Sequence, residues 1–174
     1  MRTTTSHATK TSSACFWTYS PSRWSFTSPR STARGWCPLG NESSDLSVDD
    51  HLRIAAELLT YSAWTLSQRS DPAAIGHAIT DAYYAALHAV SAYVLARHDE
   101  RARSHVDRDR WLRDRRFPEF TDQDRREYFG LKSASEAARY HGRIFTILDH
   151  TLLRQRAERL VAKWGDRAKR APPA

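Results

Sequence analysis

The sequence predicts an all-α protein: an antiparallel four-helix bundle with one short additional helix and a disordered N-terminal tail. Beyond residue 47, apolar residues recur at steps of three and four over long stretches, which is the helical period. Glycine and proline are rare there, and no run of alternating β-branched residues indicates a strand. Four amphipathic helices of roughly 18–26 residues close most simply as an antiparallel bundle.

The first 44 residues have a different composition. They contain 10 Ser and 8 Thr with six aromatic residues, and Leu39 is their only Leu, Ile or Val. We predict that residues 1–46 are disordered, because they bury too little apolar area to offset an ordering cost of about 1–2 kcal/mol per residue. Three interpretations stay open: a targeting segment, a basic arm for nucleic acid, or translated sequence upstream of a true start at Leu46 or Val48.

Two helices are predicted over 48–67 and 72–97. Ser47 is a suitable N-cap for the first helix, and Asp71 is one for the second, in which Pro72 takes the first helical position. The second helix has the stronger helical pattern in the sequence, because its apolar residues repeat regularly. Many alanines accompany them and permit close helix contact. That face comprises Ile75, Ile79, Tyr83, Leu87, Val90 and Val94.

The second half of the chain contains a short helix and two long ones. The short helix is predicted over 107–115, and Pro118 then interrupts the chain. A long helix over 122–139 begins after the cap Thr121 and stops at Gly142. The last helix is expected over 147–164, with Leu148 and Leu152 in its apolar set. Residues 47–165 thus form the folded domain, and residues 166–174 a frayed C-terminal tail.

Charge and composition exclude several classes of protein. The net charge is +7, from 27 basic and 20 acidic residues, and residues 1–44 contribute five basic residues against one acid, or +4. The folded part is therefore only mildly basic, which permits nucleic-acid binding without requiring it. No apolar stretch is long enough to span a bilayer, so we expect no membrane partner and a cytoplasmic location. We also expect no cofactor, and no metal, because no Glu-x-x-His pair appears on the predicted helices. Both cysteines, Cys15 and Cys37, lie in the tail, so the sequence favours neither a zinc finger nor a cysteine nucleophile.

Polar residues on the second helix make the first candidate site. His77, Asp81, Tyr84 and His88 stand at i, i+4, i+7 and i+11, so they share one side of that helix. Such a row can orient an imidazole as a general base, but a single helix offers too few ligands for a metal. A hydrogen-bond network at a bundle edge, or a dimer surface, explains the same pattern.

The segment from Arg97 to Arg116 is the second candidate. Its arginines suit phosphate recognition, Trp111 is available for base stacking, and His105 lies among them. The competing interpretation is a solvated charge run, because Asp107 and its acidic neighbours interleave with the arginines at ion-pair spacing.

The third candidate lies between the last two long helices. Arg139, Tyr140, His141 and Arg143 are followed by His150. Histidine can take the proton of a 2′-hydroxyl and arginine can stabilise the charge that develops on phosphate, so this set suits RNA cleavage. A helix C-terminus that carries cations to match its dipole is the alternative.

These patterns together resemble the HEPN superfamily of small helical domains over about residues 48–164. The resemblance is carried by four short stretches: Ala82-Tyr83-Tyr84-Ala85-Ala86-Leu87-His88-Ala89, Ser104-His105, Leu131-Lys132 and Ala138-Arg139-Tyr140. It implies a dimer, and many members are metal-independent RNases of toxin or defence type. Their motif is Arg, four to six residues, then His at a dimer cleft, which Arg143 and His150 match with six residues between them, although Ile144 stands where the family has a polar residue.

The resemblance implies a bacterial protein that binds RNA or a nucleotide as a homodimer. Its implied enzymatic activity is that of an endoribonuclease. Arg143 and His150 are then the catalytic pair, as phosphate clamp and general base. Six residues are expected to bind substrate: Arg139, Tyr140, His141, Tyr84, His88 and His105. The alternative is a non-enzymatic interaction module that partners a nucleotidyltransferase or an antitoxin, as do family members without the motif.

Overall fold

A computed structural model describes residues 46–114 and 116–170. In this part the chain forms five helices and no strand, which confirms the all-helical prediction. The helices are α1 (Val48–Gln68), α2 (Pro72–His98), α3 (His105–Arg113), α4 (Asp122–Tyr140) and α5 (Ile147–Arg170). The predicted tail falls almost wholly on residues 1–45, which lie outside the described residues, as do residues 171–174.

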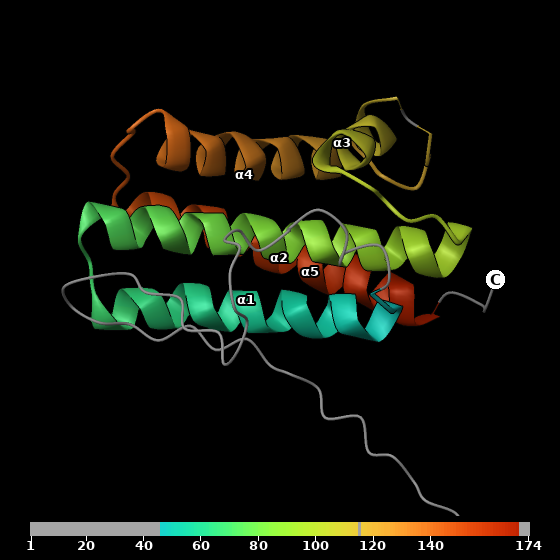
Figure 1. Cartoon of the computed structure of the whole chain (residues 1–174), viewed down its shortest axis with the longest axis horizontal. Coiled ribbons are helices and arrows are strands. Elements are labelled where there is room, and N and C mark those ends of the chain that lie inside the picture. The colour runs from blue at the N-terminus through green and yellow to red at the C-terminus, as the bar shows by residue number, and fades with distance from the viewer. Residues whose placement is uncertain (1–45, 115, 171–174) are drawn as a thin grey trace, which may run out of the picture. The chain divides into compact units, whose positions relative to one another are not determined.

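Helix α2 is the central element. It packs against α1, α4 and α5, and Figure 1 shows it between α1 and α4 with α5 behind. The apolar face predicted for it is buried, because all six of its residues are at most 4% exposed. Six of its alanines, at positions 78, 82, 85, 86, 89 and 92, are fully buried as well. Small side chains let the neighbouring helices approach α2 closely, so most of the core forms around this one helix.

Side-chain caps begin the helices where the sequence predicts them. Ser47 and Asp50 form a reciprocal capping box on α1, and Thr121 and Asp124 form one on α4. The Asp71 side chain accepts the first free N–H groups of α2. These bonds satisfy backbone donors that have no partner inside the helix, which fixes where each helix starts.

Three helix boundaries differ from the prediction by two residues or more, and one of them is the end of α3, which lies at Arg113 rather than at residue 115. Helix α3 begins two residues earlier, at His105, because the Ser104 hydroxyl caps it by accepting the N–H of Asp107 (3.2 Å). Helix α5 continues six residues beyond Trp164 to Arg170, whereas the sequence predicts fraying from residue 166. The buried side chain of Ala168 extends the packed face of α5 over this last stretch. At its other end, Leu148 and Leu152 are 66% and 48% exposed, so they do not join the core.

A glycine ends α4 as expected. Gly142 adopts a left-handed conformation, with φ of 60°, and Arg143 then donates its backbone N–H to the carbonyl of Ala137 (3.2 Å). The chain turns there towards Phe145, which is buried. Among the described residues, no helix has the length and apolar character needed to cross a membrane.

Candidate functional site

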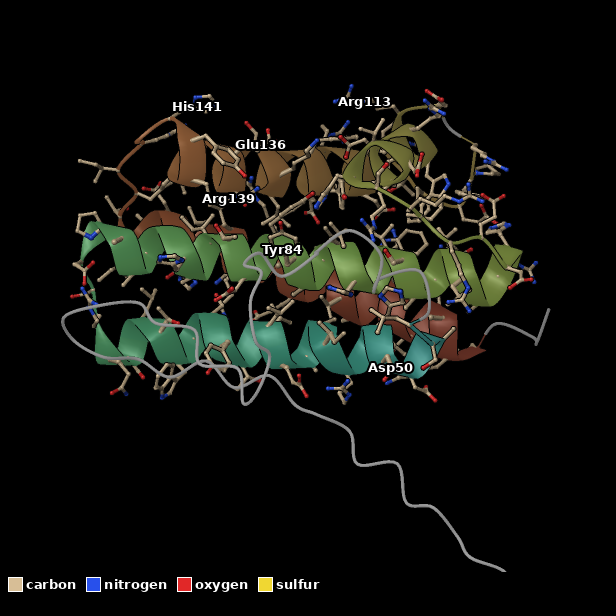
Figure 2. The ribbon with its side chains drawn as sticks, viewed as in Figure 1. Asp50, Tyr84, Arg113, Glu136, Arg139 and His141 are labelled. Carbon is tan, nitrogen blue, oxygen red and sulfur yellow. The ribbon has the colours of Figure 1, made fainter. Side chains whose placement is uncertain are left out.

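A polar stripe runs along the side of α2 between α1 and α4. The four residues predicted from the sequence, His77, Asp81, Tyr84 and His88, continue into one more polar residue, Ser91, a further step of three along the helix. Because residues advance roughly 100° each around a helix, these five share one side of α2. Figure 2 shows Tyr84 on this side, with Arg139 facing it from α4.

Tyr84 lies at the centre of a cluster built by three helices. Arg139 of α4 donates from Nη1 to the Tyr84 hydroxyl (3.3 Å), and its guanidinium lies 4.8 Å from the centre of the Tyr140 ring. His105, the first residue of α3, meets the Tyr84 ring edge-on at 5.8 Å. We call Tyr84, His105, Arg139 and Tyr140 the Tyr84 cluster. Four of the six predicted binding residues therefore come together.

The charge around the Tyr84 cluster is positive. Lys132 is neutralised by Asp109, with which it forms a close ion pair, and it also contacts Glu136. Within the described part of the chain, neither Arg139 nor the buried Arg108 forms an ion pair with a carboxylate. An arginine that forms no ion pair within the described residues, beside an aromatic ring, suits an anionic ligand that also carries an aromatic ring, as a nucleotide does.

His105 is neutral at neutral pH. Burial lowers its pKa below 6.5, and the charges of Arg108 and Lys132 lower it further, against a smaller opposing effect of Asp109. The ring is nevertheless exposed, and its Nδ1 lies 3.4 Å from the Tyr83 hydroxyl. An exposed neutral imidazole keeps one nitrogen able to accept a proton, which is what a general base requires.

His88 is engaged elsewhere. Its Nδ1 lies 2.8 Å from Nδ1 of His51 on α1, a residue that the sequence analysis did not single out. Burial lowers the pKa of His51 to about 4 and that of His88 to about 3. Both rings are therefore neutral at pH 7, and one donates to the other. The spacing of residues on α1 gives no sign of this pair, because it arises from contact between two helices.

The structure places His150 and Arg143 apart from the Tyr84 cluster. His150 is buried, and its Nε2 lies 2.8 Å from the hydroxyl of Ser62, which itself donates to the carbonyl of Ala78. His150 must therefore donate from Nε2, and burial lowers its pKa to about 4. Arg143 is exposed and lies over the Phe145 ring at 4.9 Å.

The predicted catalytic pair is thus not joined. In the residues that the structure describes, no hydrogen bond or ion pair links Arg143 to His150. His141 is the exposed C-cap of α4, with its backbone N–H bonded to Ala137.

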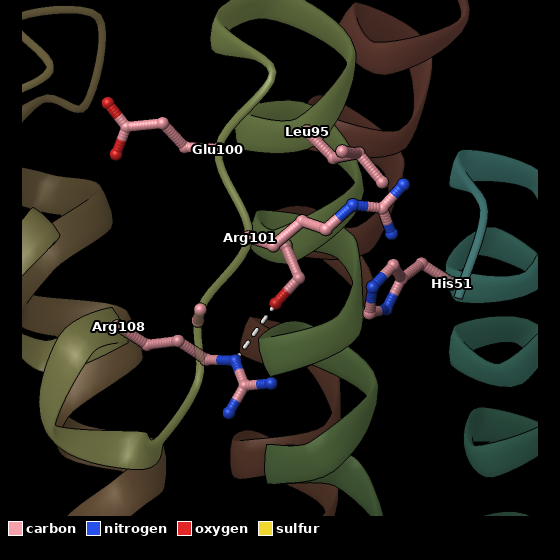
Figure 3. Close-up of a pocket in the computed structure, with 7 residues that line it drawn as sticks. His51, Leu95, Glu100, Arg101 and Arg108 are labelled. Carbon is pink, nitrogen blue, oxygen red and sulfur yellow. Dashed lines mark hydrogen bonds between the residues drawn. The ribbon is translucent and has the colours of Figure 1, made fainter. Parts of the chain in front are cut away.

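Two hollows adjoin buried histidines, one at His51 and one at His150. The first lies at the far end of the polar stripe and is lined by His51, Ser91, Leu95, residues 100–102 and Arg108 (Figure 3). The second, of about 280 Å³, lies between α1 and α5, where His150, Arg154 and Leu66 are among its lining residues. No group of three or more His, Cys, Asp or Glu side chains in the described ranges is placed to hold a metal ion.

Helices α2, α3 and α4 thus bring together the aromatic ring of Tyr84, the neutral imidazole of His105 and the guanidinium of Arg139. Comparison with known proteins adds no relative: no protein-family model matches the chain, and no curated protein matches it.

Proposed function

We propose that this chain is a HEPN-like protein that binds RNA or a nucleotide at the Tyr84 cluster. The observation that carries the proposal is the meeting of Tyr84, His105 and Arg139 on one side of α2, where the Arg139 guanidinium forms no ion pair with a carboxylate of the described residues. Phosphate binds to Arg139 through charge-assisted hydrogen bonds, and a base stacks on the Tyr84 or Tyr140 ring.

The same groups suit metal-independent cleavage of RNA. His105 takes the proton of a ribose 2′-hydroxyl, and the resulting oxygen attacks the neighbouring phosphorus atom. The bond from phosphorus to the 5′-oxygen breaks, that oxygen takes a proton from water, and a cyclic phosphate forms. Arg139 stabilises the negative charge that develops on the phosphate oxygens. On this proposal the protein is an endoribonuclease of toxin or defence type.

We also infer that α1, α2, α4 and α5 form an antiparallel four-helix bundle to which α3 is the short addition. Contacts between neighbouring helices support this arrangement. Residues 51 and 62 of α1 meet residues 88 and 78 of α2, so the order of contacts is reversed between the two helices. Ion pairs from Asp124 to Lys163 and from Glu127 to Arg159 give the same reversal for α4 and α5.

Arg143 and His150 stay a proposal as a second catalytic pair. His150 lines the hollow between α1 and α5, which supports access to it. Arg143 lies over Phe145 in this structure, so the pair requires movement of residues 141–146, or an arginine from the other copy of a homodimer, to act on one phosphate.

The alternative is a non-enzymatic interaction module, and one surface favours it. Large apolar side chains are exposed where α1 and α5 adjoin: Tyr61, Trp64, Ile147, Leu148 and Leu152 are 48–66% exposed. Exposed apolar groups of this kind mark protein contacts, so they fit a homodimer or a complex with a nucleotidyltransferase or an antitoxin. If Leu148→Glu and Trp64→Glu leave the oligomeric state and partner binding unchanged, this alternative fails.

RNA binding and cleavage by matched variants test the main proposal. We expect Arg139→Ala to weaken binding of a short fluorescent RNA. Arg126→Ala serves as the control, because Arg126 is an exposed residue of the same helix that bonds to the neighbouring Gln123. His105→Ala should abolish cleavage and preserve most of the binding. Wild-type behaviour of both variants would favour the interaction module, and loss of cleavage only in Arg143→Ala and His150→Ala would assign catalysis to that pair.

A further inference from the structure

Asp81, in the middle of α2, is a carboxylate without a partner in the described part of the chain. It is half-buried, and no hydrogen bond or ion pair from these residues reaches its side chain. Burial alone raises its pKa, to about 6, because the charged form loses water and gains no donor in exchange. Asp109, by contrast, is held by an ion pair with Lys132. Hydrogen-bond donors from a ligand would therefore stabilise the charge of Asp81.

The Asp81 carboxylate lies on the side of α2 that carries Tyr84. The two residues are three positions apart, which places their Cβ atoms about 5–6 Å from each other on a helix surface. His77, one turn before Asp81, is exposed, so this side of α2 is open to solvent there. The buried polar atoms that lack a partner do not include the oxygens of Asp81, so a ligand can reach them.

Tyr84 thus has a guanidinium at its hydroxyl and a carboxylate one turn away along α2. Arg139 is the group that we propose for phosphate, whereas a carboxylate repels phosphate. Asp81 suits a part of RNA that offers hydrogen-bond donors. In an RNA strand the ribose offers a single hydroxyl, because its 3′-oxygen is esterified. Donors that can satisfy both oxygens of Asp81 at once therefore lie on the edge of a base.

Guanine is the base whose donors match a carboxylate. Its N1–H and one N–H of its 2-amino group lie side by side, so they can meet the two oxygens of one carboxylate. Adenine and cytosine offer an amino group next to an acceptor nitrogen, and uracil offers one N–H between two carbonyl groups. The lone pairs of a carboxylate repel those acceptors.

We propose that Asp81 is a specificity-determining residue that binds the N1–H and 2-amino groups of a guanine whose ring stacks on Tyr84. The inference rests on the proposed function and deepens it, because it names the preferred ligand as RNA or a nucleotide that contains guanine. Arg139 then binds the phosphate and Asp81 selects the base.

RNAs that differ at a single base test the contact with the full wild-type chain. Short uracil RNAs with one guanine, inosine or adenine at the centre are compared by fluorescence anisotropy. Inosine keeps N1–H but lacks the 2-amino group, so we expect it to bind about tenfold more weakly than guanine. Adenine places an acceptor opposite Asp81 and should bind more weakly still. Equal affinity for the three RNAs overturns the proposal.

Asp81→Asn should change the preferred base. An amide offers one acceptor and one donor, which match the N1–H and the 2-carbonyl group of xanthine. The variant should therefore bind an RNA with xanthine better than the RNA with guanine. Asp166→Asn, at an exposed acid of α5, removes the same charge and should keep the wild-type preference. If Asp81 is only structural, Asp81→Asn will keep that preference as well, which refutes the contact.

The same measurements separate this inference from the proposed function. If the wild type binds RNA, loses affinity in Arg139→Ala and shows no preference for guanine, the Tyr84 cluster keeps its function and only the role of Asp81 is refuted. If the wild type binds neither these RNAs nor a guanine nucleotide, the proposed function fails and the inference fails with it. The wild-type series needs no variant, so it decides the base preference even where a substitution unfolds the chain.

Discussion

Arg139 donates a hydrogen bond from Nη1 to the hydroxyl of Tyr84, 3.3 Å away, and so ties the C-terminal end of α4 to the open side of α2. The two residues are 55 positions apart in the sequence. Their contact holds the Arg139 guanidinium, which we propose binds phosphate, beside the Tyr84 ring, on which we propose a base stacks.

Substitutions of Tyr84 should separate the roles of ring and hydroxyl. Tyr84→Ala removes the stacking surface and should weaken binding of single-stranded RNA about tenfold, because base–aromatic stacking contributes about 1–3 kcal/mol. Tyr84→Phe keeps the ring and should change the affinity much less. Fluorescence anisotropy with one labelled RNA measures both variants. Equal effects of the two substitutions would show that the hydroxyl, and not the ring, matters.

The rate of RNA cleavage should depend on the protonation of His105. Since the pKa of His105 lies below 6.5, the imidazole is neutral at pH 7 and activity should fall only as the pH drops through that lower pKa. His105→Gln preserves polarity but cannot accept the proton, so it should be inactive at every pH. A cleavage rate that keeps falling from pH 8 to pH 6.5 would contradict this assignment of the base.

Folding stability should fall in mild acid. His51, His88 and His150 have folded-state pKa values of about 4, 3 and 4, against 6.5 when unfolded, so the unfolded chain binds more protons below pH 6.5. Each such histidine contributes stability that is complete above pH 6.5 and declines by up to about 1.4 kcal/mol per pH unit towards pH 4. Asp81 acts oppositely, because burial raises its pKa to about 6 and protonation therefore favours the folded state.

Urea unfolding between pH 7.5 and pH 4.5 measures this loss. His51→Asn with His88→Asn should flatten the profile, whereas His141→Gln, at an exposed position, should leave it as in the wild type. If the double variant loses as much stability between pH 7.5 and pH 4.5 as the wild type does, protonation of His51 and His88 does not destabilise the fold, and the prediction is wrong.

Two glycines should respond in opposite directions to the same substitution. Gly142→Ala forces a side chain into a left-handed conformation and should destabilise the protein by about 1 kcal/mol, although nothing lies within 4 Å of its Cβ position. Gly130→Ala lies inside α4, where the Cβ has ordinary contact with the end of Arg156, and should stabilise by up to about 1 kcal/mol. Thermal unfolding of both variants checks the contrast.

The helices were predictable because their signals are local. Caps such as Ser47 and Thr121 act within one turn, and the face from Ile75 to Val94 needs only the helical period. The end of α5 was not predictable, because burial of Ala168 depends on neighbours far away in the chain.

The site was predictable in part for the same reason. Tyr84, His105 and Arg139 carry residue types that suit phosphate and base, and the sequence singles out all three. Their meeting depends on how α3 and α4 pack on α2, as does the contact of His51 with His88. Spacing along the chain also singled out Arg143 and His150, and in the structure Arg143 lies over the Phe145 ring while His150 bonds to Ser62.

The bridge between His51 and His88 joins two chemically equivalent nitrogens, so a single hydrogen must occupy it. When one ring supplies that hydrogen, its own Nε2 is left bare, while the other ring carries its hydrogen at Nε2. The couple therefore always turns one donor and one acceptor towards its surroundings. Exchanging the two tautomers reverses the polarity of the couple without moving a heavy atom.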